Sequence, residues 1–149
     1  MVGSNISSIR SAAKYKQTVL LIDDQSTLLD IHTAILKSLK MNLKIVTMTD
    51  PVEALSWMQN KQVDLVVTDF HMPQMDGMRL VQSIKSAQNG MLRYIIVVTV
   101  LKDKAVHQAL IAAGATACLT KPVQAAELAN VAKNLLNKSK QNDDLNHTD

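Results

Sequence analysis

Cysteine, aromatic residues and long apolar runs are all scarce in this chain of 149 residues. Its single cysteine, Cys118, cannot form an internal disulfide, which is typical of proteins from reducing compartments. No run approaches the roughly 20 apolar residues that a membrane-spanning helix needs. The serine-rich first 17 residues also lack the apolar stretch of a secretion signal. We therefore expect a soluble cytoplasmic protein with no membrane contact.

The positive charge of the chain is local. The net charge is +3, and Arg10, Lys14 and Lys16 account for it, because acidic and basic residues balance in the rest of the sequence. Tyr15 is the one aromatic residue among these basic residues, which is too few for the repeated stacking by which proteins bind single-stranded nucleic acids. We therefore expect a flexible, solvated tail over residues 1–17 and no direct contact with nucleic acid.

The hydrophobic content, 47% of the residues, is sufficient for one domain to fold by burial alone. Short apolar runs alternate with segments of helical period, which predicts an α/β fold in which helices join parallel strands. The predicted strands are 18–22, 43–47, 63–68, 94–99 and 117–120. The predicted helices are 26–39, one that begins after Asp50, 78–87, 103–113 and 124–136. Because residues 138–149 are polar, we expect a second flexible tail there and a folded domain over 18–137.

Local signals mark the ends and faces of these helices. Asp50 is the predicted N-cap of the second helix, with Pro51 at its first position, and Gly114 is the predicted C-cap of the fourth. Two sets of apolar residues are predicted to face the core at helical spacing. In the first helix they are Leu28, Ile31, Ala34, Ile35 and Leu39, and in the second Ala54, Leu55 and Met58.

Three aspartates directly follow predicted strands: Asp23 and Asp24 the first strand, and Asp69 the third. The carboxyl ends of strands in an open parallel sheet line the crevice where ligands bind. Three carboxylates brought together repel one another, so the arrangement calls for a cation, and Mg²⁺ prefers such hard oxygen ligands. A single aspartate at such a position is ordinarily a turn former. The convergence of three from separate strands favours a metal site.

Thr99 and Lys121 end the fourth and fifth predicted strands, on the same edge of the sheet. A threonine hydroxyl can donate a hydrogen bond to one phosphoryl oxygen, and a lysine ammonium can neutralise another. Taken singly, each residue would be read as a strand threonine and a surface lysine. Lys121 precedes Pro122, and a cis bond there would turn the lysine back towards the crevice.

This pattern resembles the receiver domains of bacterial two-component response regulators, of which the chemotaxis regulator is the simplest. The matching segments are Val-Leu-Leu-Ile-Asp-Asp at 19–24 and Asp-Phe-His-Met-Pro-Gln-Met-Asp-Gly at 69–77, followed by Thr99 and Lys121-Pro122. From the second aspartate of the first segment, successive intervals of 45, 30 and 22 residues separate the key positions, as is typical of the family. The resemblance implies a flavodoxin-like, doubly wound (βα)5 fold with strand order 2-1-3-4-5.

The resemblance also implies a function for each residue of the site. Asp69 would accept a phosphoryl group from a phosphohistidine on a sensor histidine kinase or a histidine phosphotransfer protein. Asp24, Asp69 and the backbone carbonyl of His71 would bind Mg²⁺ directly, with Asp23 acting mostly through water. Thr99 and Lys121 would hold the transferred group. The protein would then be no enzyme beyond its own phosphorylation and dephosphorylation, and a conformational switch would carry the signal to a downstream protein target.

The sequence departs from the family at two positions near the predicted site, Cys118 and Val100, and Leu101 occupies a position that tunes the lifetime of the phosphoryl group in the family. Cys118 stands three residues before Lys121, where the family has a tyrosine or phenylalanine that follows the movement of Thr99. A small thiol cannot sweep between buried and exposed positions as a ring does, and we interpret Cys118 as a small buried hydrophobe rather than a redox group. Val100 adds bulk beside the site. Because Leu101 cannot orient a water molecule, we expect self-dephosphorylation to be slow or ordinary.

Several alternatives stay open at this point. The chain is expected to be a stand-alone receiver, and the alternative is a receiver cut from a longer regulator with a DNA-binding or enzymatic output domain. Dimerisation through the fourth helix, fifth strand and fifth helix is a further alternative. A phosphohydrolase with an aspartate nucleophile is disfavoured, because enzymes resembling the haloacid dehalogenase group need a second aspartate where this chain has His71.

Overall fold

The computed structural model describes residues 16–87, 91 and 93–146, with side chains up to residue 142. Of the predicted tail over 1–17, residues 1–15 therefore lie outside the described residues. The described strands are β1 Gln17–Ile22, β2 Leu43–Met48, β3 Leu65–Asp69, β4 Tyr94–Thr99 and β5 Ala117–Thr120. They form one parallel sheet in the order β2-β1-β3-β4-β5, which confirms the predicted α/β class and strand order.

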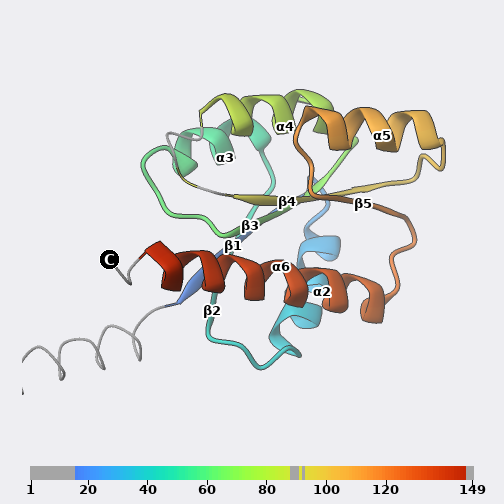
Figure 1. The fold of residues 1–149 in the computed structure, drawn as a ribbon. Helices are drawn as coiled ribbons and strands as arrows, with labels where there is room; N and C mark the ends of the chain where they lie inside the picture. Colours follow the sequence, from blue (N-terminus) through green and yellow to red (C-terminus); the bar gives the residue numbers. More distant parts are fainter. Residues whose placement is uncertain (1–15, 88–90, 92, 147–149) are drawn as a thin grey trace, which may run out of the picture.

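Helices cover both faces of this sheet (Figure 1). They are α2 Ser26–Lys37, α3 Pro51–Met58, α4 Gly77–Ser86, α5 Lys104–Ala113 and α6 Ala125–Asn146. Helices α3, α4 and α5 lie on one face, and α2 and α6 lie on the other. Each face has its own apolar cluster, so β3, which lies between the two, is buried at every position. Burial on both faces explains why its first three residues, Leu65 to Val67, are all apolar and do not alternate with polar ones.

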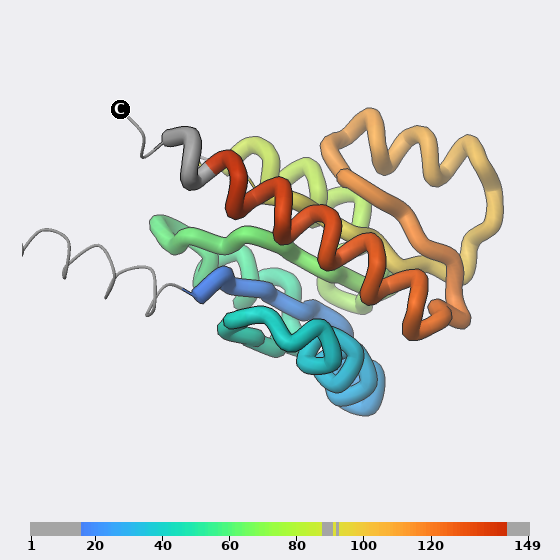
Figure 2. The backbone as a smooth tube through the Cα atoms, turned by 60° about the horizontal axis from the view of Figure 1, so that its bottom comes forward, coloured from blue at the N-terminus to red at the C-terminus, as the bar shows by residue number. Residues whose placement is uncertain are grey.

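Strand order reverses between β1 and β3, because the chain leaves β1 for β2 on one side and returns to β3 on the other. Crevices for ligands form at such reversals, beyond the carboxyl ends of the strands. In Figure 1, β4 and β5 run towards the right-hand side, where α5 and α6 begin. Because all the strands are parallel, the others end on the same side. In Figure 2 the start of β1 and the part of α6 drawn in red lie near one another at the opposite end, where Gln17 donates a hydrogen bond to the carbonyl of Leu136.

The predicted helix caps are confirmed. The Asp50 carboxylate accepts a hydrogen bond from Val52 N–H at 2.9 Å, at the start of α3. Gly114 ends α5 with a φ of +125°, a conformation that side chains disfavour. A Cβ atom at this position would also meet the side chain of Lys85, which would have to move, so the backbone conformation is the main reason for glycine here.

The predicted inward face of α2 is only partly right. Of the predicted stripe Leu28, Ile31, Ala34, Ile35 and Leu39, Ile35 and Leu39 are partly buried and pack against the apolar core, whereas Ile31 is 49% exposed. The buried residues are Leu29, His32 and Leu36, which face β1 and α6. The prediction missed this face because a polar histidine stands in the middle of it, and the pattern of apolar residues alone favoured the neighbouring stripe.

The last helix is longer than predicted. Helix α6 continues to Asn146, ten residues past the predicted end at 136, so the segment 138–146 of the predicted polar tail is helical. Ser139 is buried and donates a hydrogen bond to Asp64 at 2.8 Å, and Asn142 donates one to the hydroxyl of Tyr94 at 3.0 Å. Polar contacts with the sheet, which composition cannot reveal, hold this part of the helix. Among the described helices none combines the length and apolar character of a membrane span.

Candidate functional site

Three carboxylates meet beyond the ends of β1 and β3, as the sequence predicts. Asp23 and Asp24 follow β1, and Asp69 is the last residue of β3. One carboxylate oxygen from each lies within 4.8 Å of the others. Asp23 and Asp69 are buried, whereas Asp24 is exposed and keeps the cluster open to solvent. The pairing of β1 with β3 places these strand ends side by side.

The carboxyl group of Asp23 is buried but only partly hydrogen-bonded. Its Oδ1 accepts a hydrogen bond from Gln25 N–H at 2.9 Å, but its buried Oδ2 has no hydrogen-bond partner among the described residues. Burial raises the pKa of this carboxyl, and the nearby charges of Asp69 and Asp24 raise it further, against the lowering effects of the Gln25 hydrogen bond and Lys121. The group therefore lacks a positive partner for its second oxygen.

Asp69 is held by Lys121, which follows β5. The Lys121 ammonium lies 2.8 Å from Asp69 Oδ1. The main-chain N–H of Lys121 donates to the carbonyl of Thr99 at 2.7 Å, which places the lysine beside the end of β4. The Lys121–Pro122 bond is cis. The structure thus brings together two predicted site residues that are 52 positions apart in sequence. A lysine at this distance orients the carboxylate and offsets part of its charge.

Thr99 ends β4 at the same edge of the sheet. Its neighbour Val98 lies opposite Asp69 in the β3–β4 register. The threonine is fully buried, and its hydroxyl oxygen accepts a hydrogen bond from Leu101 N–H at 3.1 Å. The hydroxyl hydrogen is not used by that bond, so Thr99 keeps the capacity to donate.

His71 lies in the loop between β3 and α4. Its side chain is exposed, and its ring meets the edge of Phe70 at a centroid distance of 5.0 Å. The loop turns back on itself, because Gly77 N–H donates to the carbonyl of Phe70 at 2.7 Å. A Cβ atom at Gly77 would lie 2.9 Å from the Cα of Phe70, so only glycine fits this close approach.

A buried histidine near this cluster escaped the sequence reasoning. His32 on α2 is buried, and burial lowers the pKa of its imidazole, followed by the charge of Lys121, with Asp69 acting in the opposite sense. The sequence did hold a signal, because His32 stands three residues after Leu29 and four before Leu36. That spacing places it in the middle of one helical face.

Cys118 lies on β5 and is half-buried against the cluster that contains Val97 and Leu110. Burial raises the pKa of its thiol, so the reactive thiolate is disfavoured at neutral pH. These observations support the interpretation of Cys118 as a small packed hydrophobe.

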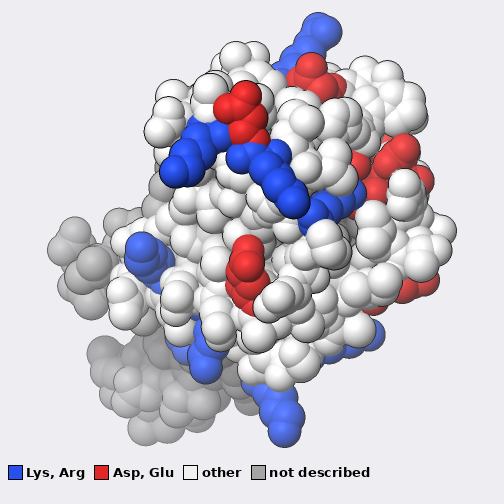
Figure 3. All heavy atoms as spheres, turned by 90° about the vertical axis from the view of Figure 1, so that its right-hand side faces the viewer, with Lys and Arg blue, Asp and Glu red and all other residues white. Residues whose placement is uncertain are grey.

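The carboxylate cluster has the composition of a site for a divalent cation. All its ligand atoms are oxygens, which suits a hard cation. A bound cation would also stabilise the buried Asp23 Oδ2, which has no hydrogen-bond partner among the described residues. Figure 3 views the molecule from the side where the strands end, and acidic and basic side chains are interspersed on this face. The charge of the cluster is therefore a local feature and not part of a broad acidic surface.

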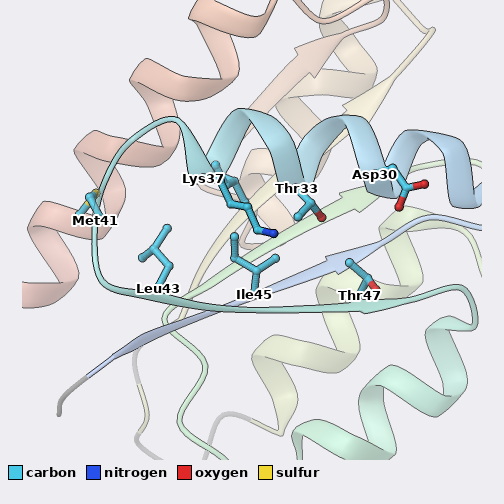
Figure 4. Close-up of a pocket in the computed structure, with 8 residues that line it drawn as sticks. Asp30, Thr33, Lys37, Met41, Leu43, Ile45 and Thr47 are labelled. Carbon is cyan, nitrogen blue, oxygen red and sulfur yellow. The ribbon is translucent and has the colours of Figure 1, made fainter.

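A groove of about 390 Å³ runs between α2 and the edge strand β2, away from the cluster (Figure 4). Lys37 from the helix and Ile45 from the strand point towards one another across it. Asp30 is the one carboxylate among its lining residues, so the groove lacks the converging acidic groups of the cluster. Among the described residues, the acidic groups that converge lie at the strand ends and not in this groove.

Comparison with known proteins gives a consistent result. A family model described as the response regulator receiver domain matches residues 19–133. The cyclic di-GMP phosphodiesterase response regulator RpfG of Xanthomonas campestris is 30% identical over 125 residues, which cover 84% of this chain and 33% of that protein. The chain spans about a third or less of the length of the first curated relatives it matches.

Two solved structures illustrate the similarity of the fold. A response regulator receiver domain protein from Clostridium thermocellum is 29% identical with a TM-score of 0.73, covering 84% of this chain and 98% of that one. The receiver domain of a sensor histidine kinase from Pseudomonas aeruginosa PAO1, which has a magnesium ion coordinated in its active site cleft, is 24% identical. Its TM-score is 0.71, and the match covers 83% of this chain and 99% of that one.

Proposed function

The chain belongs to the response regulator receiver domain family, and we propose that it accepts a phosphoryl group on Asp69. The observation that carries this proposal is the Asp69 carboxylate, which adjoins two other carboxylates and lies 2.8 Å from the Lys121 ammonium. A nucleophile, a cationic partner and an acidic cation site at one edge of the sheet are what phosphoryl transfer requires.

We propose that Mg²⁺ binds at the acidic cluster. Asp24, Asp69 and the backbone carbonyl of His71 would be its protein ligands, with Asp23 contributing mostly through water. When bound, Mg²⁺ would offset the repulsion between the carboxylates and the phosphoryl oxygens. The buried and unpartnered Asp23 Oδ2, with the raised pKa of that carboxyl, supports this assignment.

The proposed transfer is a displacement at phosphorus. An Asp69 oxygen forms the new P–O bond while the P–N bond of a phosphohistidine on the partner breaks, and the electron pair of that bond leaves with the imidazole. Lys121 neutralises charge on the transferred group, and the Thr99 hydroxyl donates a hydrogen bond to it. Lys121 already lies beside Asp69, so its positioning costs little when the group arrives.

Partners and output follow from membership of the family, whose curated relatives include a sensor histidine kinase of Escherichia coli. We propose that a histidine kinase or a histidine phosphotransfer protein supplies the phosphoryl group and that a downstream protein reads the switch. The surface formed by α5, β5 and α6 is the proposed face for a homodimer. Because the curated relatives are longer, a receiver within a larger regulator is the second candidate, which intact-mass measurement on the natural protein would distinguish.

Incubation with Mg²⁺ and acetyl phosphate, followed by intact mass spectrometry, tests the proposal. The native protein should gain one phosphoryl group, and Asp69→Asn should gain none. Asp30→Asn is the matched control, because it makes the same chemical change on the exposed face of α2 and should behave as native. Chelation of Mg²⁺ should abolish the modification. Two results would contradict the proposal. One is phosphorylation of Asp69→Asn to the native extent, and the other is a native protein that is neither phosphorylated by acetyl phosphate nor able to bind beryllofluoride.

A further inference from the structure

The connection between β4 and α5, residues 100–103, is tied at both ends through Leu101. The N–H of Leu101 donates to the hydroxyl oxygen of Thr99 at 3.1 Å. The carbonyl oxygen of the same residue lies 2.7 Å from Nε2 of His107 in the first turn of α5. Leu101 is thus bonded to the predicted phosphoryl-binding hydroxyl on one side and to a helix on the other.

The second contact shows which nitrogen of the His107 ring carries a hydrogen. A backbone carbonyl can only accept a hydrogen bond, so Nε2 of His107 must carry a hydrogen. The main-chain N–H of His107 also donates to the carbonyl of Asp103 at 3.2 Å, which anchors the residue at the start of α5. The ring is therefore a fixed donor aimed at the Leu101 carbonyl.

The Thr99–Leu101 bond depends on the position of the Thr99 oxygen, although it leaves the hydroxyl hydrogen free. In the arrangement where Asp69 is paired with Lys121, this oxygen accepts from Leu101. If the Thr99 side chain rotates to bring its hydroxyl to a phosphoryl group on Asp69, the oxygen moves away and Leu101 N–H loses its acceptor. The intervening residue Val100 is 58% exposed and Leu101 is only half-buried, so little packing holds the segment in place once that bond is broken.

We propose that His107 is a positioning residue that restrains Thr99 through Leu101 and couples the phosphoryl site to α5. This inference rests on the proposed function. It offers a route for the switch that needs no aromatic residue on β5, where this chain has the small Cys118. Cys118 and Val106 of α5 pack against the same apolar cluster, so this part of the structure is filled without a large ring.

The sign of the coupling follows from linkage. A contact made only when Thr99 is bonded to Leu101 stabilises that arrangement and opposes the one that binds a phosphoryl group. Removal of the contact should therefore strengthen the binding of a phosphoryl mimic. The expected gain is about 3- to 10-fold in affinity, the range that one hydrogen bond to the backbone can supply.

Two variants of His107 isolate this hydrogen bond. His107→Leu fills a similar volume without a donor, whereas the amide of His107→Gln places an N–H near the position of Nε2 and should preserve the bond. Binding of beryllofluoride in the presence of Mg²⁺ can be measured by titration calorimetry for each. Nitrogen NMR of the native imidazole, assigned by the loss of its signal in His107→Gln, reports the ring directly.

The expected result is tighter binding by His107→Leu, native binding by His107→Gln, and a change in the His107 ring signals when beryllofluoride binds to the native protein. Equal or weaker binding by His107→Leu, or a ring signal that does not respond, would overturn the inference and leave the phosphoacceptor proposal intact. Failure of the native protein to bind beryllofluoride would instead overturn the proposed function, and this inference with it.

Discussion

Two aspartates, one at the amino ends of the strands (the amino edge of the sheet) and one at their carboxyl ends (the carboxyl edge), are equally buried and differ in how their oxygens are bonded. Asp64, just before β3, and Asp23, just after β1, are each 1% exposed. Asp64 Oδ2 accepts a hydrogen bond from Thr18 N–H at 2.8 Å, and its Oδ1 accepts one from the hydroxyl of Ser139 at 2.8 Å. Asp23 has one oxygen bonded and the other without a partner among the described residues.

Further hydrogen bonds connect separate elements near Asp64, at the amino ends of the strands. The amide of Gln17 donates to the carbonyl of Leu136 on α6 at 2.7 Å. The guanidinium of Arg93 donates to the carbonyls of Met58 and Lys61 at 3.0 and 2.9 Å, which ties the end of α3 to the start of β4. These bonds join elements that are far apart in sequence.

The difference teaches that burial alone does not show what an aspartate does. A buried carboxylate with both oxygens bonded holds the fold together, because each bond replaces one lost to water. A buried carboxylate with a free oxygen and like-charged neighbours costs stability, and such costs are concentrated at sites that bind ligands. The contrast applies to these two carboxylates, with Asp64 stabilising the fold and Asp23 belonging to the binding site, because Arg93 Nε near the start of β4 is also buried without a partner among the described residues.

The largest test of this contrast is Asp64→Ala. The substitution leaves Thr18 N–H and the Ser139 hydroxyl without their acceptor, which should lower the free energy of unfolding by about 2–4 kcal/mol. Urea unfolding measures the loss, and Ser139→Ala, which removes a single hydrogen bond, should lose only about 1 kcal/mol. The folded fraction of Asp64→Ala should still bind beryllofluoride with Mg²⁺. A loss of that binding with full stability would reverse the assignment of the two carboxylates.

Local chemistry made the carboxyl edge predictable from the sequence. The apolar runs located all five strands, and four of the strand ends, those of β1, β3, β4 and β5, carried a recognisable residue: Asp23, Asp69, Thr99 and Lys121. Because parallel strands all end at one edge, these residues had to converge, and the structure places three carboxylates and Lys121 together there. Asp50 and Gly114 were likewise identified by short-range signals at helix ends.

The amino edge was invisible to the same reasoning. Asp64 and Ser139 are 75 residues apart, and neither residue type signals a partner at such a distance. The polar residues after 137 therefore appeared to be a tail, whereas α6 continues to Asn146. The face of α2 was misjudged because His32 is buried against expectation. Non-local packing decided each of these features, and a single sequence does not record it.

A smaller effect of opposite sign is expected for Asp23→Asn. Without Mg²⁺ the substitution removes a buried charge and its repulsion from Asp69, so the free energy of unfolding should rise by about 1 kcal/mol. Addition of Mg²⁺ should stabilise the native protein, because a ligand that binds only the folded state shifts the equilibrium towards it. The stabilisation of Asp23→Asn by Mg²⁺ should be much weaker. Destabilisation of this variant in the absence of Mg²⁺ would make the two carboxylates alike and contradict the comparison.

The smallest effect is the pH dependence of that difference. Burial raises the pKa of Asp23 above its ordinary value of 3.8, so over the interval between these two values the native state holds a proton that the unfolded chain has released. The native state then binds more protons than the unfolded state, and the contribution of Asp23 to stability falls as pH rises through this interval. Above the raised pKa the carboxyl is charged in both states, and the loss is complete.

Asp23→Asn has no such group, and all other carboxyls are shared by the two proteins. The free energy of unfolding of the variant minus that of the native protein should therefore grow with pH from about 4 upwards and then level off. Urea unfolding of both proteins in chelator, at a series of pH values, gives this difference directly. With Mg²⁺ present the difference should shrink, because the cation stabilises the charged form of the cluster. A difference that stays constant over the whole series would show that Asp23 is as well satisfied as Asp64.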